Sequence, residues 1–369
     1  MSKVLMKGND AVAEAIVRAG CRFFAGYPIT PQSEILEYLS RRMPEVDGVF
    51  VQSESELSGI SMVYGAAACG FRAFTSSSGP GFSLLQEGIS YIASAELPCV
   101  ILDVQRYGSG LGDIFIGQSD YWQAVKNGGH GDYRTLVYAP NSVQESVDLA
   151  CLAFDKAEEY RNPVVLLSDA SIAQMMEPVD LPEMVEYDPD SKDWALKGKG
   201  NGEFKRHTSV MYYMDDYDSH IRGKYADIEE KEQRWESLQC EDADVVLVAY
   251  GISSRICEEA AAMARRNGQK VGVVRPISLY PFPVKAFENL AHVKAFLCVE
   301  MTMLAQMYED VALATRMKAP IYKLNGGTVL YDSADVCIKL DEVYAGLEDC
   351  NSNTGTIPKE RNGLLICKN

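Results

Sequence analysis

Short apolar runs alternate with segments of helical spacing over the first 170 residues, and this alternation constrains the fold more than any other feature. The runs predict buried strands at 21–25, 48–51, 99–104, 135–138 and 163–167, with a further strand that begins at 71. Helices are predicted over 10–18, 32–39 and 57–69, and in a segment that ends at 157. Because parallel strands need crossover connections, the pattern predicts an α/β domain built on a parallel sheet.

The polar segment 178–241 interrupts this pattern. It contains the acidic pairs Asp215-Asp216 and Glu229-Glu230, and its composition predicts no strand and one charged helix over 227–238. An exposed linker is the simplest interpretation. A structureless loop of this length inside a compact enzyme is uncommon, however, so we favour a wrapped, partly ordered excursion that contacts another subunit.

Alternation resumes at 243–251 and predicts a second, smaller α/β domain. A helix is expected over 254–267, and strands at 270–275, 295–299 and 321–323. A chain of 369 residues exceeds the size at which a single core keeps growing. The predicted division is a first domain over 1–177, the polar segment 178–241, a second domain over 242–350 and a tail over 351–369.

Charge and cysteine spacing exclude several classes of function. The net charge of −17 argues against binding to nucleic acid or to an anionic membrane surface. No segment approaches the roughly 18 apolar residues of a membrane helix, and the N-terminus lacks an export signature, so we expect a cytoplasmic protein. None of the ten cysteines lies within four residues of another, so we expect no metal site or iron–sulfur cluster on this chain.

Three of the predicted strands are followed by loops with polar groups. Thr30 lies in the run 26–31, the acids Glu54 and Glu56 open the helix at 57–69, and a Ser/Gly-rich turn occupies 76–81. Open α/β sheets bind ligands at the carboxyl ends of their strands. The simpler interpretations are a Pro-rich turn with a helix-capping threonine, and two solvated acids at a helix N-terminus.

In this order, the three loops resemble the pyrimidine-binding domain of thiamine diphosphate enzymes and, more narrowly, the alpha subunit of 2-oxoacid:ferredoxin oxidoreductases. The resemblance covers residues 5–345, and 275–283 resembles the transketolase C-terminal domain. Within the family, the branched-chain members that use 3-methyl-2-oxobutanoate are the nearest match. The resemblance implies an α/β thiamine diphosphate-binding fold followed by a transketolase C-terminal-like domain.

The resemblance also implies site residues. Glu56 precedes Gly65 by nine residues, as the family's glutamate precedes a helix glycine, whereas Glu54 is eleven away. Glu56 is therefore expected to hydrogen-bond the cofactor's aminopyrimidine ring, and Thr30 and Arg106 to contact the 2-oxo acid. The expected cofactor-binding residues are Tyr27, Pro28, Ile29, Glu56, Ser77, Ser78 and Gly79. A surface arginine at a strand end is the alternative for Arg106.

Two further segments bear on the site. The glycine-rich run 108–112 lacks the full spacing of a dinucleotide fingerprint, and we interpret it as a flexible active-site loop. The run 300–307 departs from the pattern common in the family, which leaves the role of that loop open, although Gln306 and Met307 keep the pattern.

The chain lacks the Gly-Asp-Gly run with which thiamine enzymes hold the diphosphate through Mg²⁺. The resemblance therefore implies a beta subunit that supplies this half-site and a [4Fe–4S] cluster, together with gamma and ferredoxin-like delta subunits. The implied reactants are a 2-oxo acid, coenzyme A and ferredoxin. Two alternatives remain: a 2-oxoglutarate or aryl-pyruvate enzyme of the same family, and a non-catalytic scaffold subunit of such a complex.

Overall fold

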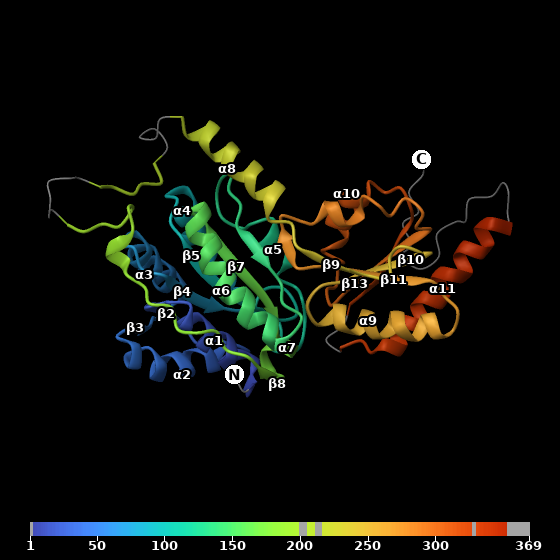
Figure 1. Cartoon of the computed structure of the whole chain (residues 1–369), viewed down its shortest axis with the longest axis horizontal. Coiled ribbons are helices and arrows are strands. Elements are labelled where there is room, and N and C mark those ends of the chain that lie inside the picture. Colours follow the sequence, from blue (N-terminus) through green and yellow to red (C-terminus); the bar gives the residue numbers. More distant parts are fainter. Residues whose placement is uncertain (1–2, 199–204, 211–215, 327–329, 353–369) are drawn as a thin grey trace.

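The computed structural model describes residues 3–198, 205–210, 216–326 and 330–352. Two large sheets lie side by side along the long axis, and a third sheet has two strands (Figure 1). The larger sheet has seven strands in the order β12-β6-β7-β5-β4-β2-β3. Its strands are β2 (Phe23–Gly26), β3 (Val49–Gln52), β4 (Ala73–Ser77), β5 (Cys99–Gln105), β6 (Leu136–Tyr138), β7 (Pro163–Asp169) and β12 (Ser278–Tyr280). All neighbours in it pair in parallel except β12 and β6, so the α/β architecture is as predicted.

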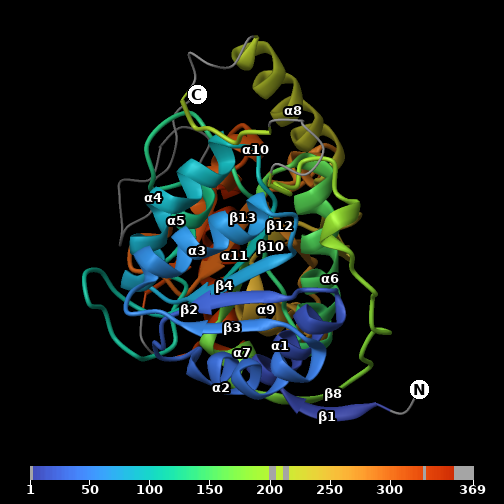
Figure 2. The same cartoon turned by 90° about the vertical axis from the view of Figure 1, so that its left-hand side faces the viewer.

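Helices cover both faces of this sheet. One face carries α1 (Gly8–Arg18), α2 (Ser33–Arg42) and α6 (Val143–Tyr160), and the other carries α3 (Glu56–Ala68) and α4 (Pro80–Ser94). Figure 2 shows α1 and α2 on one side of β2 and β3, with α3 and α4 on the opposite side. Each face buries its own apolar cluster, because successive side chains of a strand point to opposite sides.

The second sheet has five strands in the order β14-β13-β10-β11-β9. They are β9 (Trp235–Leu238), β10 (Val245–Val248), β11 (Val271–Pro276), β13 (Ala295–Glu300) and β14 (Ile321–Asn325). The associated helices are α9 (Gly251–Arg266), α10 (Tyr308–Thr315) and α11 (Ser333–Ser352). The remaining elements are β1 (Val4–Lys7) and β8 (Met176–Val179), which pair with each other, and the short helices α5 (Tyr121–Val125) and α7 (Ala170–Gln174).

The expectation for residues 227–238 was wrong. Helix α8 (Tyr217–Lys231) begins earlier than predicted and ends at Lys231, so only the first part of the predicted span is helical, and β9 follows as an antiparallel edge strand on β11. Glu232 explains the break: its carboxylate is buried, accepts a hydrogen bond from Tyr160 and pairs with Lys156, which fixes the chain just after the helix. β9 lies at the sheet edge with three of its four residues exposed, among them the charged Glu236, so its sequence does not have the apolar pattern of a buried strand.

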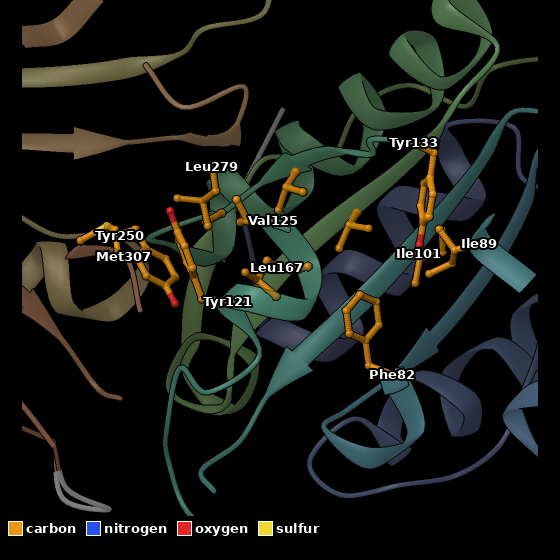
Figure 3. Packing of buried hydrophobic residues seen from close by; sticks show 14 of the residues in the cluster. Phe82, Ile89, Ile101, Tyr121, Val125, Tyr133, Leu167, Tyr250, Leu279 and Met307 are labelled. Atoms are coloured by element: carbon orange, nitrogen blue, oxygen red, sulfur yellow. The ribbon is translucent and has the colours of Figure 1, made fainter. Parts of the chain in front are cut away.

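The two sheets share an apolar core. Figure 3 shows that this core extends from Phe82 of α4 and Ile101 of β5, past Tyr121 and Leu279, to Met307 beside the second sheet. Polar contacts reinforce this junction, and Gln118 makes the most extensive ones. Its side chain is fully buried, donates to the Tyr250 carbonyl at 3.1 Å, and accepts from the Ser253 hydroxyl at 2.9 Å and the Met301 N–H at 3.0 Å.

Gln118→Ala is expected to lower the thermal stability of the chain. The substitution leaves the buried Ser253 hydroxyl and the Met301 N–H of the second domain without their partner, and each such group costs about 1–3 kcal/mol. Thermal denaturation of the variant should show a loss of at least about 2 kcal/mol. Gln269→Ala, which removes one exposed hydrogen bond to Asp341, is the control and should change stability by less than about 0.5 kcal/mol. Equal stability of the two variants would contradict the role of Gln118.

Candidate active site

The candidate site lies where the connections of the large sheet change direction. From β2 the chain passes through α2 to β3, the edge strand of the sheet. From β4, the other neighbour of β2, it passes through α4 to β5, in the opposite direction along the sheet. Adjacent strands whose connections leave in opposite directions open a crevice at their carboxyl ends. The loop 27–32 follows β2 and the turn 78–79 follows β4, so both predicted loops flank this crevice.

Hydrogen bonds from the protein interior hold the loop after β2. Gln32 is fully buried; it accepts from the Ser76 hydroxyl at 2.7 Å and donates to the Tyr27 carbonyl at 3.1 Å. The Pro31 carbonyl accepts from Asn9 at 2.9 Å and from Gln174 at 3.0 Å. These contacts leave the outer side of the loop exposed. Thr30 is exposed there, as is Tyr27, with Pro28 and Ile29 half-buried between them.

The structure separates the two acids at the start of α3. Glu54 is exposed and accepts from the Ser58 hydroxyl at 2.6 Å, a contact that lowers its pKa. Glu56 is 5 % exposed, and its Oε1 accepts a long hydrogen bond of 3.4 Å from Ser77. Ser55 caps the helix by accepting from the Ser58 N–H. Glu56 is therefore the acid that faces the interior of the crevice, on the side of β4.

The turn between β4 and α4 leaves little room for side chains. Gly79 has a φ of +49°, which favours glycine, and an added Cβ would lie 3.1 Å from Arg106 Nε. An added Cβ at Gly81 would collide with Glu56 Oε1 and with the Ser77 hydroxyl. The Ser78 hydroxyl is buried and has no partner among the described residues. The turn is thus a close-fitting cradle with a free hydroxyl.

Arg106 directly follows β5 and connects the loops of the site. It is 6 % exposed; Nη1 donates to the Thr30 carbonyl at 3.1 Å and Nη2 to the Leu111 carbonyl at 2.6 Å. Its buried Nε has no partner among the described residues. The guanidinium therefore lies inside the crevice, against the loop of Thr30 and the turn of Gly79. It retains donor capacity for an anion, because each Nη carries two hydrogens.

The residues that follow Arg106 fold back over it. The Tyr107 N–H donates to the Phe115 carbonyl at 3.3 Å, and the Asp113 N–H to the Tyr107 carbonyl at 2.7 Å. Gly108, Gly110 and Gly112 all have positive φ, which the tight path of this loop requires. The flexibility expected of this glycine-rich loop stays a prediction.

The run 300–307 has a clear structural role. Glu300 is fully buried and accepts from the Met307 N–H and the Thr302 hydroxyl, which fixes the loop before α10; burial raises its pKa. Gln306 accepts from the Trp122 N–H at 2.8 Å and donates to the Ser119 carbonyl at 3.0 Å. The loop therefore holds the two domains together next to the site.

Sequence reasoning missed three polar residues that support the crevice: Gln32, Asp103 and Asp120. The signal for Asp103 was present, because an acid interrupts the apolar strand 99–104. Asp103 and Asp120 are both almost completely buried, and burial raises the pKa of each, that of Asp120 to about 6. Gln32 and Asp120 had no such pattern around them.

Other features lie away from the crevice. A cavity of about 1000 Å³ opens beneath α8 near Glu96 and Arg161, at the amino ends of the strands. Within the described residues, no three His, Cys, Asp or Glu side chains are grouped to hold a metal ion. Nor is any described helix long and apolar enough to cross a membrane.

Comparison with protein families identifies the chain. Residues 14–238 match the thiamine diphosphate-binding domain of pyruvate flavodoxin/ferredoxin oxidoreductases, and residues 243–333 match core domain II of pyruvate:ferredoxin oxidoreductases. The chain belongs to the 2-oxoacid:ferredoxin oxidoreductase family. The family predicted from the strand-end motifs is confirmed, and with it the presence of a thiamine diphosphate-binding domain.

Individual members of the family resemble the chain over most of its length. It is 48% identical to ketoisovalerate oxidoreductase subunit VorB of Methanothermobacter marburgensis, over 95% of this chain and 100% of that one. It is 36% identical to 2-oxoglutarate synthase subunit KorA of Methanocaldococcus jannaschii, over 93% and 94% of the two chains.

Solved structures confirm the fold class. A 2-oxoglutarate:ferredoxin oxidoreductase from Magnetococcus marinus superposes with a TM-score of 0.78 and 25% identity, over 92% of this chain and 65% of that one. A split-gene transketolase in its inactive beta4 tetramer superposes with a TM-score of 0.55 and 16% identity, over 94% and 98%, which is a likeness of fold alone. The thiamine diphosphate-binding fold of the family and the transketolase-like character are thus as predicted.

Gly81→Ala is expected to weaken binding of thiamine diphosphate by about 10-fold or more. The added methyl group must displace the Glu56 carboxylate or the Ser77 hydroxyl, and overpacking of this kind costs about 1–3 kcal/mol. Titration of the assembled complex with the cofactor measures the effect. Gly223→Ala in α8, where nothing lies within 4 Å of the added Cβ, is the matched control. Unchanged affinity in Gly81→Ala would show that the cofactor does not use this cradle.

Proposed function

We propose that the chain is the alpha subunit of an enzyme that converts a 2-oxo acid, coenzyme A and oxidised ferredoxin to an acyl-CoA, carbon dioxide and reduced ferredoxin. One observation carries the proposal: Glu56 and Arg106, which follow two different strands, both lie against the β4–α4 turn, and Arg106 also donates to the carbonyl of Thr30, which follows a third strand. The identity of 48% with a ketoisovalerate oxidoreductase subunit supports it.

The crevice fits the pyrimidine half of thiamine diphosphate. A buried carboxylate with one long hydrogen bond, an unpartnered buried hydroxyl and two glycines where a side chain would collide leave polar capacity at the turn between β4 and α4. Glu56, Ser77, Ser78 and Gly79 would hold the ring, with Tyr27, Pro28 and Ile29 on the rim. When bound, the cofactor supplies the nucleophilic carbon that attacks the 2-oxo group and the electron sink for decarboxylation.

The chain's own residues position and polarise the reactants. The Glu56 carboxylate, shielded from water, can hold a proton at the pyrimidine ring, and low exposure strengthens that contact. Arg106 offers a charged, planar donor for the carboxylate of the 2-oxo acid. Because Arg106 also donates to the Thr30 carbonyl, it orients the loop that carries the Thr30 hydroxyl towards the same substrate.

Partner subunits complete the site in this proposal. The sequence lacks the Gly-Asp-Gly run for Mg²⁺ and the diphosphate, so a beta subunit would supply them together with a [4Fe–4S] cluster. Gamma and ferredoxin-like delta subunits would complete the complex. Exposed apolar side chains on the outer faces of α3 and α4 support a subunit contact: Leu57, Met62, Leu84 and Tyr91. A cytoplasmic location and a contact of residues 178–241 with another subunit belong to the same proposal.

A branched-chain 2-oxo acid is the proposed substrate. The loop that covers Arg106 carries exposed Leu111, Ile114 and Phe115, and residues 107–118 contain no Lys or Arg. An apolar surface suits an isopropyl group, whereas the second carboxylate of 2-oxoglutarate needs another cation. The proposed reactant is 3-methyl-2-oxobutanoate.

The assembled complex should be assayed without oxygen with a panel of 2-oxo acids and a viologen dye as electron acceptor. We expect kcat/KM to be greatest for 3-methyl-2-oxobutanoate. Preference for 2-oxoglutarate or an aryl pyruvate would overturn the substrate assignment but keep the reaction. No turnover of any 2-oxo acid would favour a scaffold subunit.

Glu56→Gln is expected to lower kcat by at least about 10²-fold, since a well-placed proton-transfer group contributes about that much. The change is isosteric, so the complex should still assemble. Glu54→Gln is the matched control, because Glu54 is exposed and its main contact is with Ser58. Steady-state kinetics of both variants test the assignment, and similar losses in the two would show it to be wrong.

Arg106→Met is expected to raise KM for the 2-oxo acid by about 10- to 150-fold while changing KM for coenzyme A little. A charge-assisted hydrogen bond to a carboxylate contributes about 1.5–3 kcal/mol. Arg106→Lys should recover part of the loss, because an ammonium cannot donate to the Thr30 and Leu111 carbonyls and the substrate with one planar fork. An effect confined to coenzyme A would assign the arginine to the other substrate.

A further inference from the structure

We propose that Asp103 and Asp120 form a carboxyl pair behind the Gly79 turn, and that the pair takes up a proton when the carboxylate of the 2-oxo acid binds at Arg106. The proposal rests on the proposed function, and it assigns a positioning role to two acids that do not contact the substrate.

The pair lies in the layer beneath the crevice. Asp103 is on β5, directly beside Ser77 of β4, and Asp120 precedes α5. Gln123 links the pair to the turn, because its amide donates to Asp120 Oδ1 at 2.7 Å and to the Gly79 carbonyl at 3.4 Å. Gly79 in turn packs against the Arg106 side chain. A change of charge on the pair therefore acts on both the turn and the arginine.

The hydrogen bonding of the pair is incomplete. Asp103 is fully buried and Asp120 is 4 % exposed, yet neither oxygen of Asp103 nor Oδ2 of Asp120 makes a hydrogen bond of good geometry among the described residues, although the Gly79 N–H acts on Asp103 and lowers its pKa. Two ionised carboxylates in such a place would repel each other and lose their hydration. One proton held on the pair removes the repulsion, so the folded state favours a neutral Asp103 beside Asp120.

The charges around the pair agree with this assignment. Burial and then the charge of Asp120 raise the pKa of Asp103 well above its usual value, and burial raises the pKa of Asp120 to about 6. The backbone N–H groups of Gly79 and Arg106 and the Arg106 charge act in the opposite direction on Asp120. The charge of Asp120 also acts on Tyr250 of the second domain, and α5 contributes the uncharged Gln123.

Substrate binding should disturb this balance. The bound carboxylate neutralises Arg106, the cation that favours ionised Asp120, and adds a negative charge nearby. The pKa of Asp120 then rises, and a proton passes from solvent to its carboxylate. By linkage, the 2-oxo acid binds more tightly as the pH falls towards the pKa of the free pair. Proton uptake on binding is greatest just above pH 6, where free Asp120 has lost most of its protons.

The first experiment follows the stability of the complex and needs no substrate. A group whose pKa is raised by folding makes the folded protein less stable as the pH rises, because the folded state still binds a proton that the unfolded state has already lost. Asp103→Asn removes this loss, so the Tm of the variant relative to the wild type should rise by several degrees between pH 5 and pH 8. Asp113→Asn, a partly exposed acid of the neighbouring loop, is the control and should show no such trend.

The second experiment uses 2-hydroxy-3-methylbutanoate, which keeps the carboxylate but has no 2-oxo group to react. Calorimetric titration of the complex in two buffers of different ionisation enthalpy measures the proton uptake. We expect uptake of a fraction of a proton at pH 7, and binding about 2- to 5-fold tighter at pH 6 than at pH 8, which corresponds to a rise of about 0.5–1 in a pKa that starts at about 6. Asp120→Asn should abolish both effects, whereas Asp103→Asn should keep them.

Two results would overturn the proposal: a Tm difference for Asp103→Asn that is the same at pH 5 and pH 8, or wild-type proton uptake in Asp120→Asn. Failure of the proposed function is distinguishable, since the complex would then neither turn over a 2-oxo acid nor bind the hydroxy acid. The stability experiment would still report on the protonation of Asp103.

Discussion

The parallel pairing of β2, β4 and β5 is the constraint on which the rest of the site depends. It brings the carboxyl ends of three strands to one edge of the sheet, and the reversal of crossover direction between β2 and β4 opens a crevice there. Thr30, Ser77 and Arg106 are far apart in the sequence and reach this edge because each follows or ends one of these strands. Arg106 then links them through hydrogen bonds and packing.

Much of this arrangement could be predicted from the sequence. Apolar runs located the central strands to within a few residues, because buried parallel strands are apolar on both faces. The nine-residue separation of Glu56 and Gly65 selected between two acids of similar sequence context, and the structure places them in different environments. Local sequence patterns were sufficient to predict features, such as these strands, that depend on residues close together in the sequence.

Features that depend on distant contacts could not be predicted in this way. β9 is mostly exposed because it lies at a sheet edge. The end of α8 is set by Glu232, whose partners Tyr160 and Lys156 are about 75 residues earlier in the sequence. β12 belongs to the first sheet although its sequence lies within the second domain. The sequence also does not predict that Gln118 and Gln306 join the domains, because a buried side-chain amide has no characteristic sequence pattern around it.

The central claim is that Glu56, held in a dry crevice by the turn of β4, is the acid that contacts the pyrimidine ring of thiamine diphosphate. An experimental structure of the assembled complex with the cofactor tests this most directly. The account predicts a distance of about 2.6–3.2 Å between a Glu56 carboxylate oxygen and a ring nitrogen, with the diphosphate held by another subunit. A pyrimidine ring bound away from β4, or contacted by Glu54 in place of Glu56, would contradict it.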